Sequence, residues 1–110
     1  MNLYVATKFE LKDSAKKFMD DMEAIGHVIT YDWTKSAQID ETQAINDMEG
    51  VRKADAVIML ADQEVAYTGT LVEVGAALGL GKPVYVRGNA SVTRTLFFKH
   101  RLIRHTNDEF

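Results

Sequence analysis

Short apolar runs alternate along the chain with segments in which apolar residues recur every three or four positions. The runs Leu3–Ala6, His27–Tyr31 and Ala54–Ala61 have the length and β-branched content of strands. The last is almost continuously apolar, as expected for a central parallel strand that is covered on both faces. A fourth strand is expected over Pro83–Val86 and an edge strand at Leu102–Ile103.

Three segments between these runs have helical periodicity. The first begins at about Asp13 and stops at Gly26, the second begins at about Asp40, and the third runs from about Thr70 to Leu80 and ends at Gly81. Such alternation is typical of βαβ units with right-handed crossovers. We therefore expect an α/β fold: a doubly wound, flavodoxin-like parallel sheet of about five strands in the order 2-1-3-4-5, with helices on both faces. Residues 1–110 are expected to form a single domain.

The expected strand order places a ligand site where the first and third strands end. In sheets of this kind the ligand lies at the carboxyl ends of the strands, at the point where the strand order reverses. Three segments meet there: the loop after the first strand (Thr7, Lys8 and Phe9), the loop after the third strand (residues 62–68) and the start of the third helix. Glu73, which that helix carries, is therefore predicted to lie at the site.

Glu73 is the first candidate for chemistry. If the helix begins near Thr70, the carboxylate lies in the first turn, where the helix dipole favours its ionised form, and Gly69 leaves room for a ligand. An alternative is a capping box, in which Thr70 and Glu73 satisfy each other's backbone amides. Close packing of the helix on the sheet is a second explanation for Gly75 and Gly79.

Three further side chains are candidates, each with a structural alternative. Asp47 flanks the apolar stripe of the second helix and leans toward the sheet, unless it is a solvated boundary residue. Tyr4 lies in the first strand, either as a core residue or with its hydroxyl at the ligand site, and Trp33 either stacks on a flat ring or covers the edge of the core. No metal site is predicted, because metal-ligand spacing is absent around the histidines, which are His27, His100 and His105.

The composition limits the classes of binding partner and the cellular compartments that are expected for this chain. A formal net charge of -3 and a pI near 5.5 provide no basic field for a nucleic acid polymer. The absence of cysteine excludes disulfides and thiolate chemistry and fits a reducing compartment. Neither a signal peptide nor a membrane span is expected, so the default expectation is a cytoplasmic protein that does not contact a membrane.

Four segments together resemble the nucleoside 2-deoxyribosyltransferase superfamily, which includes deoxyribonucleoside 5'-monophosphate N-glycosidases. Their order and spacing are specific, although none is decisive alone, and they span most of the chain. The segments are Leu3–Ala6, Asn46–Val51, Ala54–Ile58 and Gly69–Val84.

The resemblance implies an enzyme that cleaves the N-glycosidic bond of nucleosides or nucleoside 5'-monophosphates without a cofactor. It assigns the nucleophile to Glu73, an assisting role to Asp47 and a place beside the sugar to Tyr4. A fixed carboxylate can stabilise an oxocarbenium-like transition state and collapse to a covalent glycosyl-enzyme, which water or a second base then releases. The resemblance also implies a homodimer or larger homo-oligomer in which a neighbouring subunit completes the pocket.

The chain departs from the family pattern before the glutamate. The transferases have a base-contacting acidic residue there, whereas this chain has Tyr67–Gly69. A phosphate could be bound by Lys8 and the amides of the third helix, with Thr68, Arg87 and Ser91 nearby, and Ser91 is also placed to cap a short fourth helix. The residues expected to bind substrate are Thr7, Lys8, Trp33, Gly69 and Thr70.

Two other functions remain open at this stage. A glycohydrolase of NAD-like dinucleotides would use a related sheet and a catalytic glutamate, and it would release nicotinamide. A non-catalytic nucleotide-binding or sensing module would keep the pocket and bind without turnover.

Overall fold

Five parallel strands form one sheet within residues 1–36 and 38–106, the part of the chain that the computed structural model describes. The observed order β2-β1-β3-β4-β5 confirms the predicted order and the flavodoxin-like fold class. The strands are β1 (Asn2–Ala6), β2 (Val28–Ile29), β3 (Ala56–Leu60), β4 (Val84–Arg87) and β5 (Ile103–Thr106).

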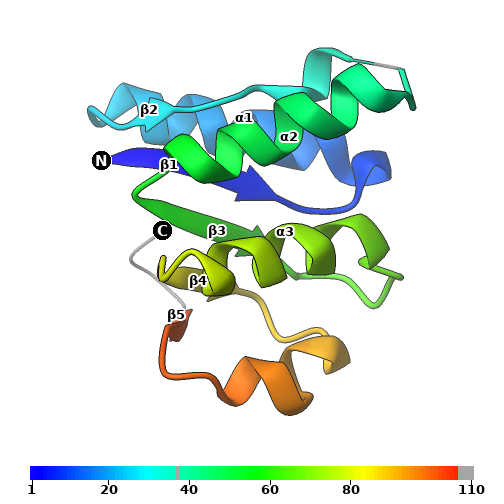
Figure 1. The fold of residues 1–110 in the computed structure, drawn as a ribbon, viewed down its shortest axis with the longest axis vertical. Helices are drawn as coiled ribbons and strands as arrows, with labels where there is room; N and C mark the ends of the chain where they lie inside the picture. Colours follow the sequence, from blue (N-terminus) through cyan, green and yellow to red (C-terminus); the bar gives the residue numbers. More distant parts are fainter. Residues whose placement is uncertain (37, 107–110) are drawn as a thin grey trace.

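Helices cover both faces of the sheet, as predicted. The helices α2 (Glu41–Lys53) and α3 (Thr68–Gly79) lie side by side over one face, and α1 (Lys12–Ala24) lies behind the sheet in Figure 1. Short 3-10 turns complete the connections: η1 (Phe9–Leu11), η2 (Trp33–Lys35), η3 (Ser91–Arg94) and η4 (Leu96–Lys99). The central strand β3 is buried along its whole length, which places the core between the two helical layers.

Several element boundaries differ from the prediction. Strand β2 has two residues rather than five, because it lies at the sheet edge and pairs only with β1. Ser91 does not cap a helix: it is the first residue of η3, and its amide and hydroxyl both donate to the Glu64 carboxylate. Helix α3 begins at Thr68 rather than Thr70, so Glu73 lies in the second turn, not the first.

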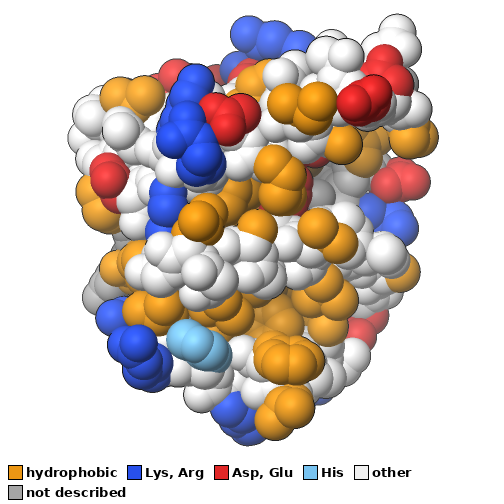
Figure 2. Space-filling model, viewed as in Figure 1, with side chains coloured by type: hydrophobic (Ala, Val, Ile, Leu, Met, Phe, Trp, Pro, Cys, Tyr) orange, Lys and Arg blue, Asp and Glu red, His pale blue; other side chains and the backbone are white. Residues whose placement is uncertain are grey.

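Close packing on the sheet, the alternative explanation for Gly75 and Gly79, is wrong. Both glycines are exposed, and a Cβ atom at either position would meet no atom within 4 Å. Apart from the inward-facing Glu73, residues 68–81 carry no charge, and the outer side of α3 forms an uncharged band across the face shown in Figure 2.

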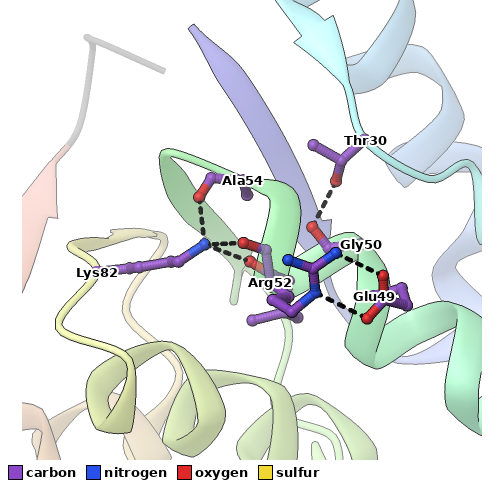
Figure 3. A network of polar contacts seen from close by, with 7 residues as sticks. Thr30, Glu49, Gly50, Arg52, Ala54 and Lys82 are labelled. Carbon is purple, nitrogen blue, oxygen red and sulfur yellow. Dashed lines mark hydrogen bonds and ion pairs between the residues drawn. The ribbon is translucent and has the colours of Figure 1, made fainter.

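Gly50 permits a close approach between α2 and β1. A Cβ atom at this position would lie 2.7 Å from Cδ1 of Tyr4 and 2.9 Å from Cβ of Tyr31. Its carbonyl oxygen accepts a 2.7 Å hydrogen bond from Thr30 Oγ1 (Figure 3). The missing side chain therefore lets α2 lie directly against β1 and the segment that follows β2.

Lys82 anchors the C-terminal end of α2. Its ammonium group donates to the carbonyl oxygens of Val51 at 3.1 Å and Ala54 at 2.6 Å, and also to that of Arg52 (Figure 3). The last carbonyls of a helix have no intrahelical donor, and a cation also complements the negative end of the helix dipole. Lys82 thus joins the turn after α3 to the end of α2.

Candidate active site

A cavity of about 460 Å³ opens at the carboxyl ends of β1 and β3. Its walls come from the loops after these strands, the segment from η2 to the start of α2, and the first turns of α2 and α3. This is the position predicted from the strand order. The predicted site residues that line it are Thr7, Lys8, Trp33, Asp47, Gly69, Thr70 and Glu73.

Tyr4 and Glu73 form the centre of the site. The Tyr4 hydroxyl donates a 2.6 Å hydrogen bond to Oε2 of Glu73. Tyr4 is fully buried in the core and does not itself line the cavity, so it contacts the site only through the hydrogen bond of its hydroxyl to Glu73. Tyr4 of β1 therefore holds the carboxyl group of Glu73 on α3, although the two residues are 69 positions apart in sequence.

Burial controls the ionisation of this carboxyl group. Loss of water raises the pKa of Glu73 from 4.5 to about 8; the Tyr4 hydrogen bond opposes that rise and the charge of Asp47 adds to it. The expectation that the helix dipole keeps Glu73 ionised is thus wrong at neutral pH, because Glu73 lies beyond the first turn and desolvation dominates. Burial, with the nearby Glu73 charge, raises the pKa of Tyr4, so Tyr4 remains a neutral donor.

The capping-box alternative is also wrong. The cap position of α3 is Tyr67, and no side chain caps the helix. Thr70 is buried, and its hydroxyl has no hydrogen-bond partner among the described residues. Glu73 is hydrogen-bonded to Tyr4 instead of turning back to the Thr70 amide.

Asp47 extends into the same cavity from α2. Its Oδ1 accepts a 2.8 Å hydrogen bond from the Gln43 amide, one turn earlier on the helix. Burial raises the pKa of Asp47, and the Gln43 hydrogen bond partly offsets this rise. The site therefore holds two carboxyl groups that retain protons more readily than free ones, each with a single neutral donor.

Aromatic rings form another part of the wall. Trp33 is 5% exposed, and its indole nitrogen donates a 2.6 Å hydrogen bond to the Val5 carbonyl, which fixes the ring. Phe9 lies beside it with a ring-centre distance of 6.2 Å and a tilt of 46°. Trp33 thus belongs to the edge of the core, as one of its two interpretations predicts, and Phe9, at 43% exposed, is the more accessible of the two rings that line the cavity.

Thr7 and Lys8 hold the loops around the cavity. The Thr7 hydroxyl donates to the Leu60 carbonyl at 2.8 Å, and the Lys8 ammonium donates to the Ala66 carbonyl at 3.2 Å. Arg87 and Ser91, considered above for phosphate binding, do not line the cavity. Arg87 lies over the Phe18 ring on the α1 side of the sheet, and Ser91 is bonded to Glu64, so neither is placed for that role.

Residues 3–97 match the family model described as nucleoside 2-deoxyribosyltransferase. The chain belongs to this family. Its cavity, with the Tyr4–Glu73 pair and Asp47, lies within the matched residues. A comparison with curated proteins found no match.

Solved structures of similar fold include family enzymes. The 2-deoxyribosyltransferase of Bacillus psychrosaccharolyticus is 22% identical over 83% of this chain and 74% of its own, with a TM-score of 0.68. The CMP N-glycosidase of Clostridium botulinum is 16% identical over 100% of this chain and 91% of its own, with a TM-score of 0.67. At these identities the likeness shows the shared fold alone.

Neither a metal site nor a membrane-spanning helix is found in the part of the chain that the structure describes. Within residues 1–36 and 38–106, no group of three or more histidine, aspartate or glutamate side chains could hold a metal ion. In the same ranges, no helix combines the length and apolar character needed to cross a bilayer.

Several residues that line the cavity were not predicted from the sequence. Gln43 could have been found, because it lies four residues before Asp47 and so on the same side of a predicted helix. The segment before α2 has no periodic pattern that would place it over a cavity. Phe9 belongs to the loop that was expected at the site, whereas the cavity residues not expected there include Glu10, Ser36, Gln38, Asp40 and Gln43.

Proposed function

We propose that this protein cleaves the N-glycosidic bond of nucleosides, deoxynucleosides or their 5'-monophosphates through a covalent glycosyl-Glu73. The sugar is then transferred to a second base or to water. Family membership supports a glycosyl-transferring or hydrolysing enzyme. The observation that carries the mechanism is the Glu73 carboxyl group, which lines the cavity and is fixed by the Tyr4 hydroxyl.

The two carboxyl groups, Glu73 and Asp47, have different roles in the proposed reaction. As the bond to the base breaks, positive charge develops on the sugar, and the Glu73 carboxylate stabilises it before forming the glycosyl ester. The leaving base needs a proton or a hydrogen bond, and Asp47, or a water molecule that it holds, supplies this in our proposal. The raised pKa of Asp47 favours the donor role.

Two parts of the cavity suit the two ends of a nucleotide. Phe9 and Trp33 offer a surface on which a base can stack. Gly69 and Thr70 lie in the first turn of α3, where backbone amides have no intrahelical acceptor and favour an anion. Lys8 is nearby in the cavity wall and could turn from the Ala66 carbonyl to a 5'-phosphate.

We also propose that the chain assembles as a homodimer or larger homo-oligomer. The support is the uncharged outer side of α3, which exposes Leu71, Val72 and, just after the helix, Leu80. Such an apolar surface is typical of an association site. Light scattering is expected to give at least twice the 12.3 kDa chain mass, and a monomer at micromolar concentration would contradict the proposal.

A substrate panel tests the proposed function. Nucleosides, deoxynucleosides, their 5'-monophosphates and NAD are incubated with the protein, with and without free adenine, and released base is followed by chromatography. Base release from at least one nucleoside or monophosphate supports the proposal, and a new adenine nucleoside identifies transfer rather than hydrolysis. Nicotinamide release from NAD alone, or tight binding without release, would replace it with one of the other two functions.

The pH dependence of cleavage is expected to follow Glu73. Only the carboxylate is a nucleophile, so with a water molecule held by Asp47 as the donor to the leaving base, kcat/KM should rise with pH through about 8 and level off above it. A fall in kcat/KM at high pH would instead identify the Asp47 proton itself as the one that the base takes. Tyr4→Phe removes a hydrogen bond that lowers the pKa of Glu73, so this rise should move to higher pH. Each unit of movement lowers the rate at pH 7 about tenfold.

The matched control for Tyr4→Phe is Tyr85→Phe. Tyr4 pairs with Val57 of β3, and Tyr85 pairs with the next residue of β3, Ile58. Because successive side chains of a strand point to opposite faces, the Tyr85 ring lies on the face of the sheet opposite to Tyr4. Its pH profile should equal that of the parent. Coincident profiles for the Tyr4→Phe variant and the parent would show that the hydroxyl does not govern Glu73.

A further inference from the structure

The orientation of Asp47 depends on a chain of hydrogen bonds outside the Tyr4–Glu73 pair. The Tyr31 hydroxyl donates to Oε1 of Gln43 at 3.2 Å, and Nε2 of Gln43 donates to Oδ1 of Asp47 at 2.8 Å. All three side chains are partly buried, and Gln43 and Asp47 line the cavity. The amide nitrogen of Gln43 can only donate, so Oδ1 of Asp47 accepts, and a proton that Asp47 carries lies on Oδ2.

The Tyr31 hydroxyl determines which atom of the Gln43 amide, oxygen or nitrogen, is turned toward Asp47. If the amide were reversed, its oxygen would face the Asp47 carboxylate, and the two acceptors would repel each other. Donation from Tyr31 to the amide oxygen leaves the nitrogen for Asp47. Tyr31 is itself held under α2, where its Cβ lies beside Gly50.

We propose that Gln43 is a positioning residue, which holds the Asp47 carboxyl group in its reactive orientation, with Tyr31 fixing the Gln43 amide. The proposal rests on the proposed function, in which Asp47 assists departure of the base. Gln43 acts through Asp47, in the same way that Tyr4 acts on Glu73. Each reactive carboxyl group thus accepts a hydrogen bond from a neutral side chain: Glu73 accepts from Tyr4 on β1, and Asp47 accepts from Gln43, one turn earlier on α2.

The surroundings of Asp47 predict how its titration changes when Gln43 is replaced. Its hydrogen bond from Gln43 lowers the pKa that burial raises, so loss of that bond should raise the pKa further. Glu73 from α3 and Tyr4 from β1 interact electrostatically with Asp47 and remain in place. The other titratable groups around the cavity are Lys8, Glu10, Tyr31, Asp40 and Tyr67.

The test compares Gln43→Leu and Tyr31→Phe with the parent and with Thr42→Ala, an exposed neighbour on α2 that does not line the cavity. Base release is measured against pH, and the Asp47 carboxyl group is titrated by carbon-13 NMR. For Gln43→Leu we expect kcat at neutral pH to fall at least about tenfold with KM changed less than about threefold. The Asp47 titration should move to higher pH, by less in Tyr31→Phe and not at all in Thr42→Ala.

Each result of this comparison is decisive. An active Gln43→Leu variant with the parent's kcat, pH profile and Asp47 titration would overturn the inference. If Gln43→Leu does not fold, Tyr31→Phe decides, because it keeps the ring and removes only the hydroxyl. If the parent releases no base from any substrate, the proposed function fails, and an unchanged Asp47 titration in the variants would then separately overturn the positioning of Asp47 by Gln43.

Discussion

Glu73→Gln is expected to lower the rate of base release by about a thousandfold or more, because the amide cannot form the glycosyl ester. The substitution keeps the size of the side chain and an oxygen that can accept from Tyr4. The fold should therefore be retained, and substrate binding should be measurable by calorimetry. Base release at the parent's rate would exclude the covalent mechanism, whatever the substrate.

The same substitution is expected to stabilise the protein at high pH. Below pH 4.5 both the folded and the unfolded chain keep the Glu73 proton; between 4.5 and about 8 only the folded chain does, so its stability falls as pH rises. Glutamine removes this dependence. The free energy of unfolding of the variant, measured with urea, should exceed that of the parent by a few kcal/mol at pH 9 and by little at pH 4.

The control for stability is Glu23→Gln, which replaces an exposed glutamate on α1. Its difference from the parent should stay small and show no rise between the two pH values. A Glu73→Gln difference that is flat with pH would mean that Glu73 is not desolvated in solution. A gain in stability accompanied by a loss of activity is common where function requires a buried charge.

Gly50→Ala is expected to destabilise the fold by about 1–3 kcal/mol, although alanine is the better helix former. The added Cβ would lie 2.7 Å from Cδ1 and 2.8 Å from Cε1 of Tyr4, whose ring is fully buried and has no space to move. Relief requires α2 to shift away from β1, which would displace Asp47 from Glu73. We therefore expect slower base release together with a lower midpoint of urea unfolding.

Gly75→Ala is the matched control. A Cβ at this exposed position of α3 meets no atom within 4 Å, so alanine should stabilise the helix by about 0.5–1 kcal/mol. The two substitutions add the same methyl group to a helical glycine and are expected to have opposite signs. Equal effects at both positions would show that α2 does not press against Tyr4.

The strand order and the place of the site could be predicted because they depend on local patterns. The apolar runs and the glycine stops of α1 and α3 indicated the elements, and right-handed crossovers then brought Glu73 to the ends of β1 and β3. The position of Asp47 followed from its place beside the apolar stripe of α2. These inferences required no knowledge of how deeply any side chain is buried.

The ionisation of Glu73 and the roles of the glycines depend on depth and contact, which periodicity does not report. A start of α3 two residues earlier moved Glu73 out of the first turn, and desolvation then outweighed the helix dipole. Gly50 and Gly75 both lie inside predicted helices, and the sequence does not show that Gly50 faces the Tyr4 ring whereas Gly75 faces solvent. The contact between Gln43 and Tyr31 joins α2 to the segment between β2 and η2, and no local pattern in the sequence indicates that these two side chains meet.

Lys82 holds together the two helices that carry the carboxyl groups of the site. By holding the end of α2 to the turn after α3, it joins the two carboxyl-bearing helices at the end remote from the site. The helices therefore cannot spread apart at that end without losing the three carbonyl contacts. Movement of one helix relative to the other is therefore left to the opposite end, where the cavity lies and where the exposed Glu10, Gln38 and Asp40 form part of its lining.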